Sequence, residues 1–579
     1  MAFQRFLFPV MLLACLMAVS FAPANAADPL VRSTAFGEVM GIEDDWNTWS
    51  WQGIPFAKAP VGELRWKAPV DPEPWSGTRV CDSFCSYCVQ YGNYISETGY
   101  ESMGGFMRKS VMAGDEDCLY LNVWRPRTCE EGLPVYVFIH GGANVIGRSD
   151  LSIYDGAHFA SEANMVFVTL NYRLGTFGWF AHQALRTGDP LGDSGNFGTL
   201  DIIKALTWIQ NNIESFGGDP GNVTVCGQSA GAMNIYTLLA SPLAEGLFHR
   251  AVLMSGAPAA CSMENAEKIS LAVIYRLLEQ DGYASTKSAA EEFLATKDDA
   301  WLRGYLLSKT PDELYPPENG GPTGLIIDRM SVPSGLGAGF IDGYVIAEHP
   351  YKAIKNGTYH RVPLMLGNTT EELKLFLPFF FTNPSKLWMS LYNYDPDNPR
   401  YKLSDFLSVS YWYTLPFYNL VASVGQLVFQ SYGVDTSAHF LADHQQDVYV
   451  YKFAWDEEPK PFDFFMGAAH AIDIAFVFGN FPSDPEGCTH MAWSEKNRAG
   501  REELSEAMMR YHAQFARTGD PNTGDLTPWL PWSNAKRSPK RIILDTDEIY
   551  MSTKYAEPFD LPCPQCTIED LVTVFLGLR

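Results

Sequence analysis

The sequence predicts an α/β fold with a mostly parallel central sheet that is flanked by helices. The continuous apolar runs Val135–His140 and Met165–Leu170 are typical of strands covered on both faces. After these runs, Leu200–Ile213 repeats its apolar residues at the spacing of a helix with one buried side. Strands that alternate with helices connect most readily as a parallel sheet with right-handed crossovers.

Other elements follow from the same patterns. Val31–Trp51 alternates apolar and polar residues, which predicts a small hairpin. The charged, helical sequence from Cys261 to Gly339 predicts an insertion over the sheet. The aromatic-rich residues 375–430 predict a further helical layer, with a few side chains at a pocket mouth. The remaining strands are expected within 116–124 and at 222–226, 250–254, 362–366 and 448–453, and the remaining helices at 230–240 and 502–515.

The N-terminus has the pattern of a secretory signal peptide. Arg5 precedes the apolar run Phe6–Val19, and Ala24-Asn25-Ala26 is a small-x-small cleavage site. Cys15 lies in a sequence that loosely resembles a lipoprotein site, but the apolar run continues past it. We therefore expect cleavage after Ala26.

The rest of the chain is expected to form one mature domain over 27–579, because it contains no repeat or low-complexity linker. No later stretch has the roughly 20 uninterrupted apolar residues that a membrane span needs. The sequence thus predicts a signal peptide over 1–26 and a soluble mature protein that is secreted or periplasmic, with no stable membrane insertion.

Composition narrows the possible partners. The 579 residues are 46% hydrophobic and 19% charged, as in ordinary globular proteins. A formal net charge of −25, from 67 acidic and 42 basic residues, repels nucleic acid and anionic membranes. Without Cys15, ten of the 11 cysteines remain, so an oxidising compartment predicts disulfides, although spacing does not say which.

The pentapeptide Gly227-Gln228-Ser229-Ala230-Gly231 fits the nucleophile-elbow pattern G-x-S-x-G. In that pattern a serine at positive φ occupies a sharp turn between a strand and a helix. The flanks agree, since Asn222–Cys226 reads as a buried strand and Ala230–Ala240 has helix-forming composition. Larger side chains in place of the glycines would collide where strand and helix cross. Ser229 is therefore the candidate nucleophile.

A serine hydroxyl is a weak nucleophile and needs a base that is itself oriented by an acid. In this arrangement the acid and the histidine follow the serine along the chain, each on a loop after a strand. The expected strand 362–366 is followed by Gly367–Glu372, and the strand 448–453 by a loop that contains His470. Its position after the last core strands distinguishes His470 from the other histidines.

Acyl transfer also requires donors that stabilise the oxyanion of a tetrahedral intermediate, and fixed backbone amides do this well. The strand that ends at His140 is followed by Gly141, Gly142 and Ala143, where the backbone can approach a ligand closely. Ala230, directly after the candidate nucleophile, supplies a further amide.

These motifs resemble the type-B carboxylesterases of the α/β-hydrolase fold, the family that includes the cholinesterases. The resemblance implies an α/β-hydrolase fold with helical insertions that form a cap over the active site. It extends over residues 30–545 and is carried by the landmarks Gly53–Gly62, Glu116–Pro126, Asn171–Arg173, Phe216–Gly231 and Phe515–Asn522.

The resemblance also implies roles for individual residues. Ser229 is the nucleophile, His470 the general base and Glu372 the orienting acid. The family acid usually lies five residues after a strand-end glycine, here Gly367, although the adjacent Glu371 remains a rival. The other implied features are oxyanion donors at Gly142, Ala143 and Ala230, a serine near the triad at Ser255, Asp473 where glutamate is common, and a disulfide between Cys88 and Cys118.

The predicted function is hydrolysis of a small-molecule carboxylic ester through an acyl-enzyme, without metal or cofactor. Gln228 stands where many members, cholinesterases included, carry glutamate. The segment 88–118 has no tryptophan, on which cholinesterases stack the choline cation. Both departures favour a neutral, fairly apolar ester. A lipase or a specialised polyester or toxin esterase remains an alternative, and the filled triad positions argue against a non-catalytic, cholinesterase-like binding protein.

Overall fold

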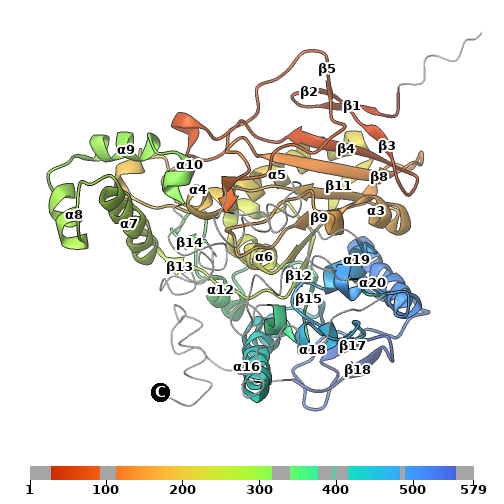
Figure 1. Cartoon of the computed structure of the whole chain (residues 1–579). Helices are drawn as coiled ribbons and strands as arrows, with labels where there is room; N and C mark the ends of the chain where they lie inside the picture. Colours follow the sequence, from red (N-terminus) through yellow and green to blue (C-terminus); the bar gives the residue numbers. More distant parts are fainter. Residues whose placement is uncertain are drawn as a thin grey trace, which may run out of the picture.

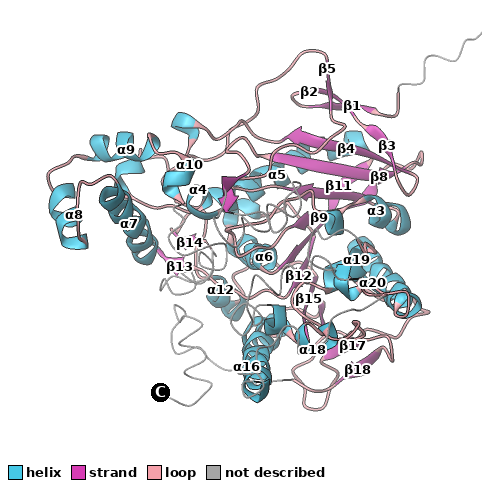
Figure 2. Cartoon of the chain, viewed as in Figure 1, coloured by secondary structure: helices cyan, strands magenta, loops and turns pink. Residues whose placement is uncertain are grey.

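The computed structural model describes residues 28–91, 112–315, 339–375, 395–397, 415–482 and 490–555. Its centre is an 11-stranded sheet with helices on both faces (Figure 2). Neighbours from β17 to β10 all run parallel, whereas the pairings at both edges of the sheet are antiparallel. The mostly parallel sheet that the sequence predicts is confirmed.

Across the sheet the order is β18-β17-β16-β15-β12-β11-β9-β10-β8-β4-β3. In chain order the strands are β3 (Ile42–Asp44), β4 (Thr48–Pro55), β8 (Tyr120–Pro126), β9 (Leu133–Ile139), β10 (Val166–Leu170), β11 (Gly218–Gln228), β12 (Arg250–Met254), β15 (Leu364–Thr369), β16 (Val448–Phe453), β17 (Arg541–Leu544) and β18 (Tyr550–Ser552).

The N-terminal segment differs from the single hairpin that was expected. β1 (Val31–Thr34) and β2 (Gly37–Met40) pair antiparallel and join β5 (Thr78–Val80) in a separate small sheet. The following hairpin, β3–β4, belongs to the main sheet. Val31–Trp51 thus contains two tight turns, so the alternating pattern divides between two sheets.

Both faces of the sheet are buried, which explains the continuous apolar strands. In β9, Val135, Val137 and Ile139 pack into one hydrophobic core, whereas Tyr136 and Phe138 pack into a second core on the other face. The first core includes residues of α5 (Phe197–Asn212), α6 (Ala230–Ala240), α12 (Pro350–Asn356) and α17 (Ser437–Ala442). The second includes residues of α3 (Ala157–Ala163), α19 (Asp473–Phe478) and α20 (Arg498–Thr518).

The expected insertion, which follows β12, begins with the two-residue strand β13 (Cys261–Ser262) and is otherwise helical as far as it is described. It contains α7 (Met263–Gln280), α8 (Lys287–Leu294), α9 (Asp299–Leu307) and α10 (Pro311–Leu314), which form the green group at one end of the molecule in Figure 1. These helices share a third hydrophobic cluster with Phe177, Phe180 and Phe197, which follow β10 in the chain. The insertion therefore packs against the segment that follows β10 and is not part of the main sheet.

Of the aromatic-rich segment 375–430, residues 376–394 and 398–414 lie outside the described residues. Its described end is α16 (Leu415–Val428), which continues into the π-helical turn Phe429–Thr436. The predicted signal peptide, 1–26, also lies outside the described residues. None of the helices described is both long and apolar enough to cross a membrane.

Candidate active site

Ser229 lies on the turn between β11 and α6, at the carboxyl edge of the parallel strands. Its backbone has φ 57° and ψ −122°, a conformation that residues other than glycine rarely adopt. The Ser229 amide donates a hydrogen bond of 2.8 Å to the carbonyl of Met254 at the end of β12. This bond fixes the strained turn to the sheet.

The two glycines of the elbow are required by close backbone contacts. A Cβ atom added to Gly227 would lie 2.4 Å from the carbonyl carbon of Gly231. One added to Gly231 would lie 2.0 Å from the carbonyl oxygen of Ile139 at the end of β9. Backbone atoms cannot move aside cheaply, so the steric reason inferred from the sequence for these glycines is confirmed.

Glu372 begins the short helix η6 (Glu372–Leu375) after β15, and its side chain is fully buried. Its Oε1 atom accepts hydrogen bonds from Ser255 Oγ at 2.7 Å and from the Thr369 amide at 2.8 Å. Its Oε2 atom accepts a short hydrogen bond from His470 Nδ1. These donors compensate for the removal of the carboxylate from water.

Glu371 is directed elsewhere. Its side chain forms an ion pair of 2.5 Å with Lys374, and its amide donates to the carbonyl of Ala468 at 3.0 Å. An isolated parallel bridge also joins Glu371 to Ala469. Through its backbone, Glu371 therefore connects the loop after β15 to the loop that carries His470.

The other imidazole nitrogen of His470 faces Gln228, with 3.1 Å between the two Nε2 atoms. Because a carboxylate only accepts, His470 Nδ1 carries the proton and its Nε2 accepts from the Gln228 amide. The Phe429 ring lies 6.2 Å from the imidazole, centroid to centroid. The histidine is thus held between Glu372 and a neutral amide.

The loop after β9 contacts the elbow directly. A Cβ atom added to Gly141 would lie 3.0 Å from Ser229 Cβ. The next residues turn sharply, with φ values of 107° at Gly142, 54° at Ala143 and 56° at Asn144. Ala230 is the first residue of α6, so its amide has no acceptor within the helix. The residues expected to form or flank the oxyanion site therefore lie together beside Ser229, namely Gly141, Gly142, Ala143 and Ala230.

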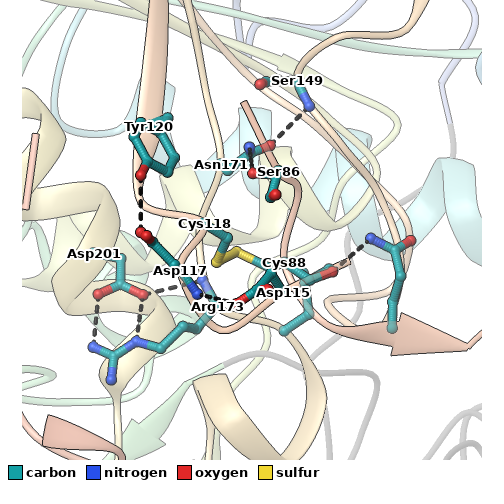
Figure 3. The surroundings of a disulfide bond; sticks show 12 residues. Ser86, Cys88, Asp115, Asp117, Cys118, Tyr120, Ser149, Asn171, Arg173 and Asp201 are labelled. Carbon is teal, nitrogen blue, oxygen red and sulfur yellow. Dashed lines mark hydrogen bonds and ion pairs between the residues drawn. A yellow bond between two sulfur atoms is a disulfide. The ribbon is translucent and has the colours of Figure 1, made fainter. Parts of the chain in front are cut away.

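The tripeptide Asn171-Tyr172-Arg173 supports this edge from the end of β10. The Tyr172 hydroxyl donates to the His140 carbonyl at 2.8 Å, and its ring stacks on the His140 imidazole at 4.4 Å. Arg173 forms a buried bidentate ion pair with Asp201, with two distances of 2.7 Å (Figure 3). Burial lowers the pKa of His140 to about 4, so its ring is neutral at ordinary pH.

A second buried carboxyl group, Asp473, begins α19 three residues after His470. Its Oδ2 atom accepts a hydrogen bond of 2.8 Å from the Tyr451 hydroxyl. Burial, and then the charge of Glu372, raise the pKa of Asp473 to about 7. This group consequently titrates in the range in which most enzymes work.

A disulfide joins Cys88 and Cys118, whose Cα atoms are 4.9 Å apart (Figure 3). It is the pairing that the family resemblance implies. Of the other cysteines described, five are free thiols, namely Cys81, Cys85, Cys129, Cys226 and Cys261. The remaining cysteines, Cys15, Cys488, Cys563 and Cys566, lie outside the described residues.

Two glutamines near the site were not singled out from the sequence. Gln426 of α16 accepts from the Glu372 amide at 3.0 Å and donates to the Thr369 carbonyl at 2.8 Å. Gln90 makes two hydrogen bonds to the backbone of Gly147, in the loop after β9. Neither belongs to a motif, and both act across long sequence separations, so no local signal identifies them.

Comparison with known proteins gives this site its context. Residues 28–557 match the model of the carboxylesterase family. The para-nitrobenzyl esterase of Bacillus subtilis is 32% identical over 534 residues, 89% of this chain and 95% of that protein. The fumonisin B1 esterase of Sphingopyxis macrogoltabida is 36% identical over 355 residues, 61% of this chain and 58% of that protein. A carboxylesterase structure from Geobacillus stearothermophilus superposes with a TM-score of 0.65 at 29% identity, covering 90% and 98% of the two chains.

The protein has the α/β-hydrolase fold, with Ser229 on a strained turn between strand and helix at the carboxyl edge of its sheet. It belongs to the carboxylesterase family and is a carboxylic ester hydrolase.

Proposed function

We propose that the protein hydrolyses neutral, fairly apolar carboxylic esters through an acyl-enzyme on Ser229. The observation that supports this most is the hydrogen bond from His470 Nδ1 to the buried Glu372, beside the Ser229 elbow. It leaves Nε2 of the imidazole as the basic nitrogen, and this nitrogen faces Gln228, the residue before Ser229.

In the proposed mechanism, Ser229 Oγ attacks the ester carbonyl carbon while its proton passes to His470 Nε2. Glu372 stabilises the imidazolium that forms. The tetrahedral intermediate then collapses, the C–O bond to the alcohol breaks, and His470 returns the proton to the leaving alkoxide. Water repeats the sequence on the acyl-enzyme and releases the acid. Since Nε2 has one lone pair, the hydrogen bond from Gln228 gives way as the proton arrives.

The amides of Gly142, Ala143 and Ala230 are proposed as the oxyanion donors. The contact between Gly141 and Ser229 supports this role, because it brings the loop after β9 to the side of the nucleophile. Fixed amides need no reorganisation as charge develops on the carbonyl oxygen, and the loss of one such donor costs about 10²–10³ in kcat.

The preference for neutral esters rests on what surrounds His470. Gln228 contributes an amide where a carboxylate would attract a cation, and it is buried beside the imidazole. Phe429 adds an apolar ring near the imidazole. An apolar acyl chain gains about 0.8 kcal/mol for each buried methylene, so kcat/KM should rise over the first few carbons and then level off.

A fluorophosphonate probe tests the nucleophile. We expect it to label Ser229, and Ser229→Ala to fold normally while it loses labelling and nearly all esterase activity. Labelling of another serine would refute the assignment. The substrate class is tested by kcat/KM for an uncharged butyrate ester against butyrylthiocholine on one preparation, and preference for the cationic ester would contradict a neutral substrate.

A bulky toxin ester is a second candidate substrate, favoured by the 36% identity to a fumonisin B1 esterase. Release of acid from fumonisin B1 with a kcat/KM above that for p-nitrophenyl butyrate would support it. If fumonisin B1 is not hydrolysed, the simpler esters remain.

We further propose that residues 1–26 are removed on export and that 27–579 form a single α/β-hydrolase domain. The apolar run and the Ala24-Asn25-Ala26 sequence support this boundary. N-terminal sequencing of the exported protein should begin at Ala27, and an intact Met1 on exported protein would contradict cleavage.

A further inference from the structure

A buried glutamine lies between the disulfide and the loop after β9. The Gln90 side chain is 2% exposed. Its Nε2 atom donates to the carbonyls of Gly147, at 2.8 Å, and Cys88, at 3.0 Å. Its Oε1 atom accepts from the Gly147 amide at 2.9 Å. One planar amide thus holds both backbone polar groups of Gly147, which fixes that residue in position and in orientation.

Gly147 closes the loop that contains the proposed oxyanion donors. The amides of Val145 and Ile146 both donate to the Gly142 carbonyl, at 3.0 and 3.1 Å. Gly147 has φ +125°, and a Cβ atom there would lie 2.3 Å from His140 Nδ1 and 2.5 Å from the Gly141 carbonyl oxygen. The end of the loop therefore packs directly against its beginning, and a shift of Gly147 moves the residues between them.

This loop needs external support because its backbone is strained. Ala143 and Asn144 both have positive φ, which is unfavourable for residues with a side chain and persists only where the surroundings enforce it. At Asn144, the Gly175 amide donates to the backbone carbonyl at 2.7 Å, and the Tyr172 hydroxyl oxygen lies 3.1 Å from Asn144 Oδ1. Gln90 supplies contacts at Gly147, three residues further along the loop.

The segment that carries Gln90 is itself anchored. Gln90 lies in β6 (Gln90–Tyr91), which pairs with β7 (Met112–Ala113), and it follows Cys88 of the disulfide by two residues. Asn171 extends the same connection, since its Oδ1 accepts from the Ser149 amide at 2.9 Å and its Nδ2 donates to the Ser86 carbonyl at 3.4 Å (Figure 3).

A stacked cation strengthens the contact between these two segments. The Arg148 guanidinium lies 4.6 Å from the centroid of the Tyr87 ring and pairs with Asp150 at 2.5 Å. Residues 86–90 thus hold residues 147–149 by several independent contacts, and Gln90 makes the one closest in sequence to the oxyanion loop.

We propose that Gln90 is a positioning residue for catalysis, which couples the disulfide-anchored segment to the backbone amides of the oxyanion site through Gly147. The proposal rests on the proposed function of Ser229 and of the oxyanion donors. Because the oxyanion exists only in the transition state and the intermediates, misplaced donors lower kcat and leave KM nearly unchanged. Gln90 does not touch the substrate.

The test compares Gln90→Met with Gln210→Met. Methionine keeps the length of the side chain and removes all hydrogen bonds of the amide, three at Gln90 and two at Gln210. Gln210 of α5 is the control, since its Nε2 also donates to two backbone carbonyls, those of Pro220 and Leu247. Pro220 lies near the start of β11, at the opposite end of that strand from the elbow. Each variant is assayed for kcat and KM with p-nitrophenyl butyrate, for thermal unfolding, for fluorophosphonate labelling of Ser229, and for inhibition by a trifluoromethyl ketone that forms a tetrahedral adduct.

We expect kcat of Gln90→Met to fall by up to about 10²-fold, the range in which a misplacement of 1 Å acts. KM should change less than threefold, and the trifluoromethyl ketone should bind more weakly in proportion to kcat. Gln210→Met, which loses two hydrogen bonds of a half-buried amide, should lose less thermal stability and keep the kcat of the native protein. If Gln90→Met is not recovered folded, Gln90→Asn, which keeps the amide but is shorter by one methylene, serves the same comparison.

Equal kcat values for the two folded variants, or a loss in Gln90→Met that appears only in KM, would overturn the role of Gln90 while Ser229 labelling stays intact. Failure of the native protein to label at Ser229 would instead overturn the proposed function itself. The two outcomes are therefore distinguishable in one set of measurements.

Discussion

His470 Nδ1 donates a hydrogen bond to Glu372 Oε2 across 98 residues of sequence, while the adjacent Glu371 is paired with Lys374. Glu372 has no exposed surface, and Ser255 and Thr369 donate to its other oxygen. The two neighbouring carboxylates therefore have different environments. One is fixed against the imidazole, and the other joins two loops.

Substitution of each glutamate tests this difference. Glu372→Gln should lower kcat by on the order of 10³-fold or more, because the amide no longer stabilises the imidazolium. Glu371→Gln should remain within a few-fold of the native kcat, since its side chain pairs with Lys374. Steady-state assays with p-nitrophenyl butyrate measure both kcat values. A larger loss of kcat in Glu371→Gln than in Glu372→Gln would make Glu371 the residue that orients His470.

Ser255 supports Glu372 through a single hydroxyl hydrogen bond of 2.7 Å. Ser255→Ala should reduce kcat by about tenfold, corresponding to ~1.4 kcal/mol, the lower end for a hydrogen bond to a charged group. Ser505→Ala is the control, because Ser505 is also buried and donates to the Phe476 carbonyl at 2.9 Å, away from the triad. Equal activities of the two variants would remove Ser255 from the mechanism.

The Gln228 amide nitrogen lies 3.1 Å from His470 Nε2, so Gln228→Glu places a carboxylate beside the imidazole. A negative charge favours the imidazolium, which cannot accept the serine proton. The acid limb of the kcat/KM profile should therefore move upward by about one pH unit or more, so that activity at pH 6 falls relative to pH 8. The ratio of butyrylthiocholine to neutral butyrate hydrolysis should rise in the same variant. An unchanged profile would show that residue 228 does not act on the histidine.

Asp473 makes stability depend on pH. Burial, and then Glu372, raise its pKa from 3.8 to about 7 in the folded protein. A carboxyl group whose pKa is raised on folding contributes fully below about pH 4, and this contribution is lost as the pH rises through 7. Asp473→Asn removes this dependence and retains an acceptor for the Tyr451 hydroxyl.

The difference between the urea midpoints of Asp473→Asn and the native protein should therefore grow in favour of the variant as the pH is raised from 5 to 8. The comparison between variants cancels the titration of all other groups. A difference that stays constant over this range would mean that Asp473 does not titrate there.

The backbone geometry of the site could be predicted from the sequence because it is encoded locally. Gly227, Ser229 and Gly231 lie within five consecutive residues, and a positive-φ turn between a strand and a helix restricts all of them at once. The apolar runs that became β9, β10, β12 and β16 were also recognisable, since burial on both faces requires them. β17 and β18 were not recognised, because such short strands are defined by their pairing with β16 and with each other.

Only the tertiary structure decided which side chains meet. Neighbouring glutamates have the same local pattern, and the direction of each depends on the loop of His470, which the parallel strands β15 and β16 bring alongside. Gln90 comes two residues after Cys88, and nothing else in the sequence around it indicates a role. Its partner Gly147 lies 57 residues further on, and the packed loops alone place the two within hydrogen-bond distance. Contacts of this kind depend on where whole segments lie relative to one another. The hydrophobic pattern within one segment does not predict that arrangement.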